Sequence, residues 1–323
     1  MSSCFVKTTC GGRLLRCVFM MALWLVSFSA FAEALLPLGH YPLPETGNIV
    51  GETYTVSVED EEDTLLDIAQ AHGIGYEEIR RANPDTSFWV PGEGTQVQIP
   101  AQYILPDVER KGVVINLAEL RLYYYPEVQE GETLRVETYP IGIGRDGFDT
   151  PLGITKTTMR LEDPAWYPPE SVRQEAAERG DPPPDVVPPG PDNPLGQHAI
   201  LLDIPGYLIH GTNQPDGIGM RASRGCIRMH PDDIKAVFEQ IPNGTQVNII
   251  DEPIKLGWDA GHLPYLQAFT SRNEQETSIS DLLNIVNKAD ELPEQKRSNI
   301  DYEVMQKALK RGSGRIEPIF SKF

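Results

Sequence analysis

The alternation of hydrophobic and polar positions divides the chain into segments of different period, and the first is residues 51–100. Alternation with a period of two gives way there to helical i, i+3, i+4 spacing and then returns. The expected elements are, in order, a strand at 53–58, a helix at 65–72, a helix at 76–83 and a strand at 95–99. Asp63 and Thr64 offer an N-cap to the first helix, Gly73 stops it, and Pro84 ends the second. We therefore expect a small βααβ domain.

Short alternating runs separated by turn residues dominate residues 111–250. The expected strands are 112–117, 120–125, 134–143, 150–155, 199–203, 207–210 and the end of 242–250, with one helix at 231–240. Several short strands with turns between them predict an all-β sandwich or barrel. Its core is expected to include Val114, Leu117, Leu120, Leu122, Tyr124 and Ile141.

A proline-rich insert at residues 163–198 interrupts this β domain. Ten prolines lie between Pro164 and Pro194, which excludes a sheet interior and makes the segment too long for a routine connection. One short helix is expected at 170–178. The insert is interpreted as a lid or rim over a site, and the alternative is a tolerated surface insertion.

The two flanking segments carry weaker patterns. Residues 33–50 contain several prolines and are interpreted as a linker or extended arm. Residues 251–323 are expected to form a partly helical C-terminal extension, with a strand at 263–270 and helices at 278–289 and 301–310. No chemistry is predicted in this extension.

The N-terminus reads as a secretory signal peptide at residues 1–32. Lys7, Arg13 and Arg16 precede an apolar run that ends in Ala30-Phe31-Ala32. The alternative is an uncleaved anchor helix, but the run is shorter than the roughly 20 residues that span a bilayer. Cleavage before Glu33 would remove three of the four cysteines and leave Cys226 as the sole thiol. An exported protein with one cysteine cannot form an internal disulfide, so that thiol is intermolecular, reactive or buried and inert.

The charge of the chain restricts its partners. With 28 Lys and Arg against 47 Asp and Glu, the formal net charge is −19. Binding to a phosphate backbone needs clustered basic residues, so no nucleic-acid partner is expected. The proportions of hydrophobic (40%) and charged (23%) residues are ordinary for a globular protein, so the acidity favours simple solubility over a specific cationic partner.

Candidate chemistry is concentrated at His210 and Cys226. A thiol attacks a carbonyl carbon as thiolate, and a nearby imidazole can take its proton. The glycine next to the histidine, Gly211, offers a main-chain carbonyl to orient the ring. The turn at Gly225 could present its own N–H and that of Cys226 as an oxyanion hole, and Arg228 could bind a substrate carboxylate. A lone histidine and cysteine would more often be structural.

Two motifs resemble the signature of the L,D-transpeptidases. They are His210-Gly-Thr-Asn213 and Ser223-x-Gly225-Cys226-Ile-Arg228-Met229, within a resemblance that runs from about residue 112 to 250. The resemblance implies a β-rich catalytic domain at 111–250. It implies Cys226 as nucleophile, His210 as proton acceptor and donor, Gly211 as the residue whose carbonyl orients His210, and Arg228, Ser223 and Asn213 as substrate-binding residues. Many relatives have histidine at the position of Arg224, which cannot act as a base.

The βααβ domain resembles a LysM module, which binds glycans that contain N-acetylglucosamine. The matching residues are Tyr54, Val56, Asp63-Thr64-Leu65, Ile68-Ala69, Gly73, Ile79, Asn83, Pro91-Gly92 and Val97-x-Ile99-Pro100. The usual glycine before Asp63 is Glu62 here. The alternative interpretation is a structural spacer.

Together the resemblances imply an exported enzyme of the bacterial periplasm whose partner is peptidoglycan. Cys226 would attack the stem-peptide bond between the L-centre of meso-diaminopimelate and D-alanine, and an amine of another stem or of an outer-membrane lipoprotein would resolve the thioester. The alternatives are an L,D-carboxypeptidase that uses water, and an inert glycan-binding wall protein. No cofactor and no metal site are expected, because the other histidines show no ligand spacing.

Overall fold

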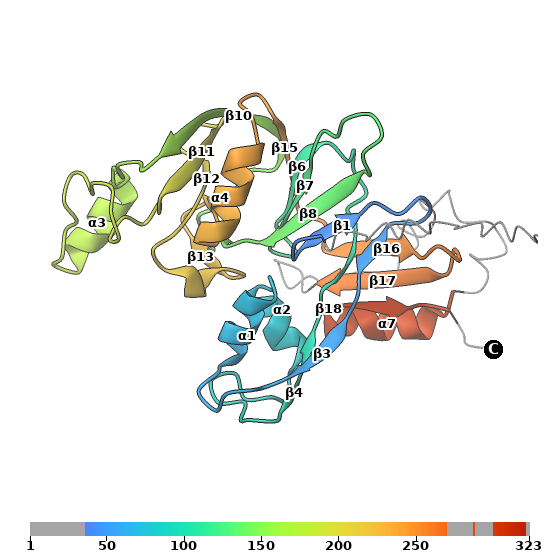
Figure 1. The fold of residues 1–323 in the computed structure, drawn as a ribbon. Helices are drawn as coiled ribbons and strands as arrows, with labels where there is room; N and C mark the ends of the chain where they lie inside the picture. Colours follow the sequence, from blue (N-terminus) through green and yellow to red (C-terminus); the bar gives the residue numbers. More distant parts are fainter. Residues whose placement is uncertain (1–35, 270–286, 288–299, 321–323) are drawn as a thin grey trace, which may run out of the picture. The chain divides into compact units, whose positions relative to one another are not determined.

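A large curled sheet carries the site-bearing part of the protein (Figure 1). The computed structural model describes residues 36–269, 287 and 300–320. The nine strands of the sheet are, in spatial order, β1 (His40–Pro42), β8 (Arg135–Pro140), β7 (Arg121–Tyr125), β6 (Gly112–Asn116), β15 (Gln246–Ile250), β10 (Gly153–Glu162), β11 (His198–Leu202), β12 (Leu208–His210) and β14 (Ile227–Arg228). The mainly β class expected for the catalytic domain is confirmed.

Strand β10 joins the two halves of this sheet. Its first residues, 153–156, pair with β15, and residues 157–162 pair with β11, with a register shift between Thr157 and Met159. The irregularity bends a long strand, as bulges do. The short strands β9 (Ile143–Gly144) and β13 (Arg221–Ser223) form a separate parallel pair, and one turn of 3-10 helix covers Pro215–Gly217.

The main core lies on one face of the sheet and is covered by α4 (Pro231–Gln240). Five of the six predicted core residues belong to it: Leu117, Leu120, Leu122, Tyr124 and Ile141. Val114 is a correction, because it packs with Tyr123 and Val136 in a second cluster on the other face. The sheet is buried on both faces here, since strand side chains alternate and β7 has no exposed position.

The βααβ order of residues 51–100 is confirmed. It consists of β3 (Tyr54–Ser57), α1 (Leu65–Ala71), α2 (Tyr76–Ala82) and β4 (Gln96–Ile99). Thr64 caps α1: its hydroxyl accepts from the N–H of Asp67, while the carboxylate of Asp67 accepts from the N–H of Thr64. This reciprocal pair satisfies donors that the first helical turn leaves open. The region has its own core, which includes Leu65, Ile79 and Val97.

The interpretation of residues 33–50 as a linker is wrong for part of that segment. Strand β1 extends the large sheet next to β8, and β2 (Ile49–Gly51) pairs with β5 (Gln102–Ile104). Pro42 is tolerated in β1 because the strand lies at the sheet edge, where a missing N–H breaks no ladder. Residues 40–42 therefore cover the β8 edge of the large sheet.

The C-terminal extension contains more strands than expected. Strands β16 (Ile254–Trp258), β17 (Pro264–Phe269) and β18 (Ser313–Pro318) form a three-stranded antiparallel sheet. The helix expected at 301–310 is α7 (Tyr302–Arg311), whose N-cap is Asp301. Of the helix expected at 278–289 only residue 287 is described, and residues 1–32, predicted to be a signal peptide, lie outside the described residues. No helix in the described ranges is long and apolar enough to cross a membrane.

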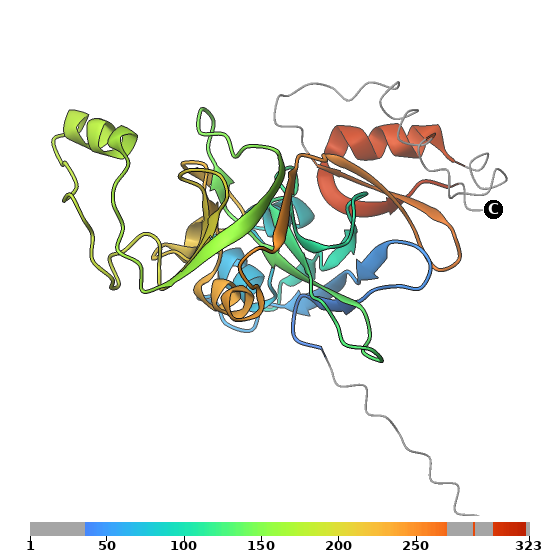
Figure 2. The same ribbon diagram turned by 90° about the horizontal axis from the view of Figure 1, so that it is seen from above.

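The proline-rich insert contains α3 (Glu170–Glu178), as expected, between loops that leave β10 and return to β11 (Figure 2). Asn193 is fully buried and ties the loops together, because its side-chain amide donates to the carbonyl of Pro164 at 2.7 Å. Trp166 and Val187 also form a bridge. The insert thus has internal order without being a sheet.

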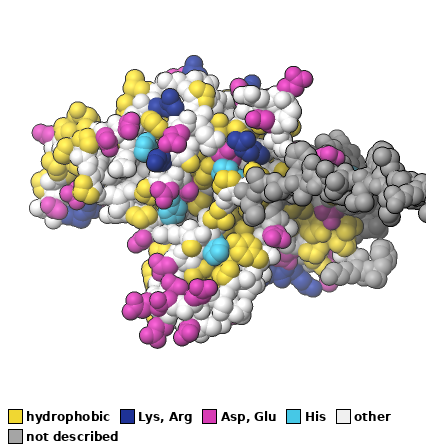
Figure 3. Space-filling model, in the orientation of Figure 1, with side chains coloured by type: hydrophobic (Ala, Val, Ile, Leu, Met, Phe, Trp, Pro, Cys, Tyr) yellow, Lys and Arg dark blue, Asp and Glu magenta, His cyan; other side chains and the backbone are white. Residues whose placement is uncertain are grey.

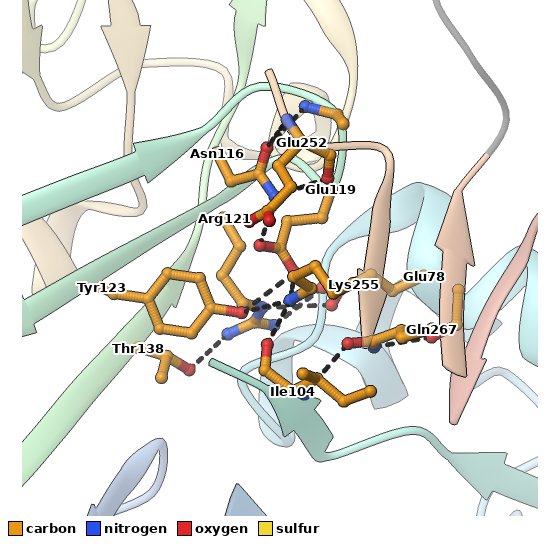
Figure 4. A network of polar contacts seen from close by, with 12 residues as sticks. Glu78, Ile104, Asn116, Glu119, Arg121, Tyr123, Thr138, Glu252, Lys255 and Gln267 are labelled. Carbon is orange, nitrogen blue, oxygen red and sulfur yellow. Dashed lines mark hydrogen bonds and ion pairs between the residues drawn. The ribbon is translucent and has the colours of Figure 1, made fainter. Parts of the chain in front are cut away.

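Buried charges connect the separate segments, and the sequence analysis did not foresee them. Arg121 on β7 donates to Glu78 on α2 at 2.8 Å. Lys255 on β16 donates to Glu119 at 2.6 Å and to the hydroxyl of Tyr123 at 3.2 Å (Figure 4). These contacts join the βααβ domain and the C-terminal sheet to one face of the large sheet.

Candidate active site

The parallel pairing of β12 with β14 places the predicted residues. Ile209 is opposite Ile227, and His210 is opposite Arg228. Ile209 and Ile227 point into the core, where both are fully buried. Because side chains alternate along strands, His210 and Arg228 share the opposite face. Cys226 directly precedes β14, in the bend that leads into the strand.

The ring of His210 is fixed from behind by the next residue. Its Nδ1 lies 2.6 Å from the carbonyl oxygen of Gly211. A carbonyl can only accept, so Nδ1 carries the proton and Nε2 is left as the basic nitrogen. A Cβ on Gly211 would stand 3.2 Å from the side chain of Ile234 on α4 and 3.3 Å from the carbonyl oxygen of Leu195. There is therefore little room for a side chain at position 211. The predicted orienting role of Gly211 has the required geometry.

The thiol of Cys226 is half-buried and free. Its Sγ lies 3.5 Å from the carbonyl oxygen of Gly206. Burial raises the pKa of the thiol, while a backbone hydrogen bond from Leu208 and the charge of Arg228 oppose that rise. Burial and then Arg228 lower the pKa of His210 to about 4. Burial therefore favours the neutral form of both the thiol and the imidazole.

This pairing predicts how the thiol responds to pH. Alkylation of Cys226 by iodoacetamide should accelerate about tenfold per pH unit between pH 6 and 8, because the raised thiol pKa keeps the thiolate a minor species there. The rate is measured by mass spectrometry of the intact protein in samples quenched at successive times. With the measurement continued to pH 10, glutathione serves as the control, since its rate levels off above an ordinary thiol pKa of about 8.5 whereas the rate of Cys226 should keep rising. A plateau for Cys226 from pH 6 to 8 would instead indicate a stable ion pair.

The turn before Cys226 is held by Ser223. The buried hydroxyl of Ser223 donates to the carbonyl of Cys226 at 2.6 Å and accepts from the N–H of Gly225 at 3.2 Å. Gly225 has a φ of +105°, a conformation that favours glycine. Ser223 thus braces the turn, and no contact supports its predicted role in substrate binding. The N–H of Gly225 donates to Ser223 in this structure, and the assignment of Gly225 and Cys226 to an oxyanion hole stays a prediction.

Two further residues support the turn and were given no role from sequence. Thr150 donates its hydroxyl to the carbonyl of Gly225 at 2.8 Å, and Tyr207 donates to the carbonyl of Asp149 at 3.0 Å. A Cβ on Gly225 would stand 2.9 Å from the ring of Tyr207. Thr150 is 75 residues from Gly225 in the chain, so no local pattern signals this contact.

The remaining predicted substrate residues differ in position. Asn213 is exposed after β12. Arg228 is half-buried, and its backbone exchanges two hydrogen bonds of 2.8 Å with Gly142. Its Nε is buried and has no hydrogen-bond partner within the described ranges. A guanidinium with an open donor beside the thiol and the imidazole fits the expected carboxylate-binding role.

Arg224 connects the turn to the proline-rich insert. Its guanidinium pairs with Glu175 on α3 and lies 4.9 Å from the ring centroid of Phe148. Glu175 also accepts from Arg145 at 2.9 Å and from Arg179 at 2.8 Å. Arg224 therefore links α3 to the turn that carries Cys226, and the interpretation of the insert as a lid stays a prediction.

Replacing Glu175 should loosen the insert. We expect Glu175→Gln to increase amide hydrogen exchange across residues 163–198 severalfold, while global stability changes by less than about 1 kcal/mol because the ion pairs are partly exposed. Hydrogen exchange measured by mass spectrometry reports separately on residues 163–198 and on the rest of the chain. Glu178→Gln, on the same helix and fully at the surface, is the matched control and should leave exchange unchanged. Equal exchange in both variants would contradict the holding role.

No group of three or more His, Cys, Asp or Glu side chains suited to a metal ion occurs in the described part of the chain. The candidate site combines the imidazole of His210 and the guanidinium of Arg228 on paired strands with the thiol of Cys226 in the bend before β14. Such a set serves acyl transfer through a covalent thioester.

Comparison with known proteins agrees with this class. Residues 110–249 match the YkuD family model, described as the L,D-transpeptidase catalytic domain. The chain is 44% identical over 241 residues to "Probable L,D-transpeptidase ErfK/SrfK" of Escherichia coli (strain K12), covering 73% of this chain and 76% of that protein. It is 39% identical over 300 residues to "Probable L,D-transpeptidase YcfS" of the same strain, covering 90% and 92%. A solved structure titled "Structure of the Ldtfm-avibactam carbamoyl enzyme" has 22% identity and a TM-score of 0.33, over 45% of this chain and 50% of that one.

The fold and the relatives define an enzyme of the L,D-transpeptidase class. The chain belongs to the L,D-transpeptidase family. Residues 51–100 lie outside the match to the catalytic-domain model, and their resemblance to LysM stays a prediction.

Proposed function

We propose that the protein is an exported L,D-transpeptidase that acts on peptidoglycan stem peptides through a thioester on Cys226. The observation that carries the proposal is the β12–β14 pairing, which sets His210 opposite Arg228, two residues after Cys226, with Nδ1 of His210 held by the carbonyl of Gly211. The family membership supplies the class of substrate.

The acylation step uses these groups. Nε2 of His210 takes the thiol proton as Sγ attacks the carbonyl carbon of the stem-peptide bond at the L-centre of diaminopimelate. The negative oxygen that develops would be stabilised by the N–H of Cys226. The C–N bond then breaks, the proton passes from His210 to the amine of D-alanine, and D-alanine leaves. A low histidine pKa suits this role, because the imidazolium that forms returns its proton readily.

The deacylation step joins the acyl group to an acceptor amine. The amine attacks the thioester carbonyl, loses a proton to His210, and Sγ leaves as the thiol regains that proton. In this proposal the acceptor belongs to another murein stem or to an outer-membrane lipoprotein. Arg228 would bind a stem carboxylate and hold the donor in line with the thiol.

The proposed location is the periplasm, with the wall as partner. It is supported by the predicted signal peptide at 1–32 and by the murein chemistry of the family. The βααβ domain would hold the enzyme near glycan strands through its resemblance to LysM. Acidic side chains gather over the end of this domain that carries α1 and the acidic run before it (Figure 3), so neutral sugars are a better expected ligand than anionic ones at that end.

Incubation of the purified protein with muropeptides that carry tetrapeptide stems tests the proposal. New cross-linked dimers with release of D-alanine are the expected products. Tripeptides with free D-alanine and no dimers would identify a carboxypeptidase that uses water. Absence of any turnover would indicate an inert glycan-binding protein and would contradict the proposal. Adding a lipoprotein peptide that ends in lysine to the same reaction reports on the other acceptor.

A further inference from the structure

A cavity of about 910 Å³ lies away from Cys226, between the βααβ domain and the C-terminal sheet. Helix α2 and strand β4 contribute one wall, and the end of α7 and strand β18 contribute the other. The two walls are joined by a hydrogen bond of 3.0 Å from Arg315 to the carbonyl of Ala82. The lining residues are Thr53, Leu65, Arg80, Arg81, Asn83, Pro84, Thr86, Phe88, Gln98, Gln102, Arg311, Ser313, Arg315, Ile316 and Glu317.

The charge of this cavity is opposite to that of the protein. Four arginines line it and one carboxylate, Glu317, does so, whereas the chain has a net charge of −19. Two arginines come from each wall. Sequence reasoning could not find this cluster, because residues 80–81 and 311–315 come together only through the docking of β18 on α2. A concentration of guanidinium groups in an acidic protein attracts anions.

The four arginines differ in the ion pairs and hydrogen bonds that their guanidinium groups already make within the protein. Arg311 pairs with Glu317, and Arg80 pairs with Glu77 at 2.7 Å. Arg81 is mostly buried, and its ion pair with Glu77 is longer, 3.6 Å from Nε, which is outside hydrogen-bond distance. Arg315 is held through one nitrogen by a neutral carbonyl. Arg81 and Arg315, one on each wall, are therefore the guanidinium groups best able to bind an added carboxylate.

The cavity also offers a hydrogen-bond acceptor. The side-chain oxygen of Gln98 is buried and has no partner within the part of the chain that the structure describes. The neighbouring Asn83 is fully used: its amide donates to the carbonyls of Ile79 and Gln98, and its oxygen accepts from the N–H of Gln98. A ligand with an N–H group would satisfy Gln98, and buried polar groups are normally satisfied.

We propose that this cavity, defined by Arg81, Arg315 and Gln98, is a second murein site that binds the carboxylates and a peptide N–H of a stem peptide. Two guanidinium groups on opposite walls can each bind a carboxylate of the same ligand, and Phe88 and Ile316 add apolar surface to the lining. A stem peptide carries several carboxylates, amide N–H groups and methyl side chains. A phosphate ion supplies only the charge, and a bare disaccharide supplies neither the charge nor the peptide. The inference rests on the proposed function, and it places a second stem on the same molecule as the thiol.

Calorimetric titration of the exported chain carrying Cys226→Ala tests the site without turnover. A disaccharide tetrapeptide should bind with a stoichiometry of two, one at the catalytic face and one in the cavity. In the additional double variant Arg81→Gln/Arg315→Gln the stoichiometry should fall to one, or the affinity of one site should fall about tenfold or more, as loss of charge-assisted hydrogen bonds predicts. Lys310→Gln removes the same kind of charge from α7 beside the cavity and should keep two sites.

Three results would overturn the inference. They are a stoichiometry of one before any arginine is changed, two unaltered sites in the arginine variant, and equal occupancy of the cavity by the disaccharide without peptide or by inorganic phosphate alone. If Arg315→Gln unfolds the chain, Arg80→Gln/Arg81→Gln on α2, on the opposite wall of the cavity, replaces it. Turnover of soluble muropeptides by the arginine variant with Cys226 intact should remain near that of the unchanged chain. If the chain without substitutions shows no turnover, the proposed function is wrong. If it turns over substrate but binds only one muropeptide per chain, this inference alone is wrong.

Discussion

Replacing Cys226 with serine is expected to lower the rate of D-alanine release from tetrapeptide muropeptides by about a thousandfold or more. An alcohol is a far weaker acid than a thiol, so it depends more on its base. The base here is weak, because burial lowers the pKa of His210 to about 4. The imidazole can assist a thiol but cannot activate a hydroxyl. Initial rates by liquid chromatography of the muropeptides measure the effect.

The serine variant also needs evidence that it is folded. Cys226 is half-buried and Ser is close to it in size, so the melting temperature should stay within a few degrees of the unchanged chain. Binding of the disaccharide tetrapeptide should persist, since Arg228 and the face around it are untouched. Activity within a factor of a few of the unchanged enzyme would mean that the thiol is not the nucleophile.

Replacing Lys255 with methionine is expected to lower the free energy of unfolding by about 3–5 kcal/mol. The ammonium lies 2.6 Å from Glu119, and the side chains of both residues are 1% exposed. Burial lowers the pKa of Lys255 and the carboxylate of Glu119 raises it, so the charge depends on this partner. Without the lysine, Glu119 becomes a buried carboxylate whose remaining neighbours, Asn116 and Tyr123, supply only neutral donors (Figure 4). Urea unfolding followed by circular dichroism gives the change.

Two variants separate the buried pair from ordinary charge loss. Lys255→Met combined with Glu119→Gln removes the unpaired charge and should recover part of the lost stability. Lys156→Met breaks the exposed pair with Asp203, whose side chains are 58% and 61% exposed, and should change stability by less than about 1 kcal/mol. Equal, small losses for Lys255→Met and Lys156→Met would contradict a stabilising role of the network.

Local patterns were sufficient to predict most helices and strands. The four elements of the βααβ domain, α3, α4 and α7 all lie within a few residues of the predicted ranges. Caps and breakers such as Thr64 and Gly73 act within one turn, so their effect can be read from neighbours in the sequence. The same holds for the hairpin β6–β7, where a short turn fixes the pairing of adjacent strands.

Predictions that depended on which segments meet were less successful. Val114 was assigned to the main core, but it faces the other side, because β6 is covered on both faces by segments from distant parts of the chain. Residues 40–42 were assigned to a linker because three residues with a proline carry no strand signal of their own. They form a strand because they pair with the edge of β8, and no pattern within residues 40–42 predicts that pairing.

The sequence by itself determined the class of this protein: the two motifs around His210 and Cys226 point to an L,D-transpeptidase, and the relatives confirm the family. Tertiary structure alone decided how the parts of the site are used. The parallel register of β12 and β14 sets His210 opposite Arg228, burial shifts the pKa values of His210 and Cys226, and Ser223 holds the turn before the thiol. It also gathers four arginines into one cavity. The physical reason is that residue types and spacings are local, whereas strand register, burial and the meeting of charges depend on contacts between residues far apart in the chain.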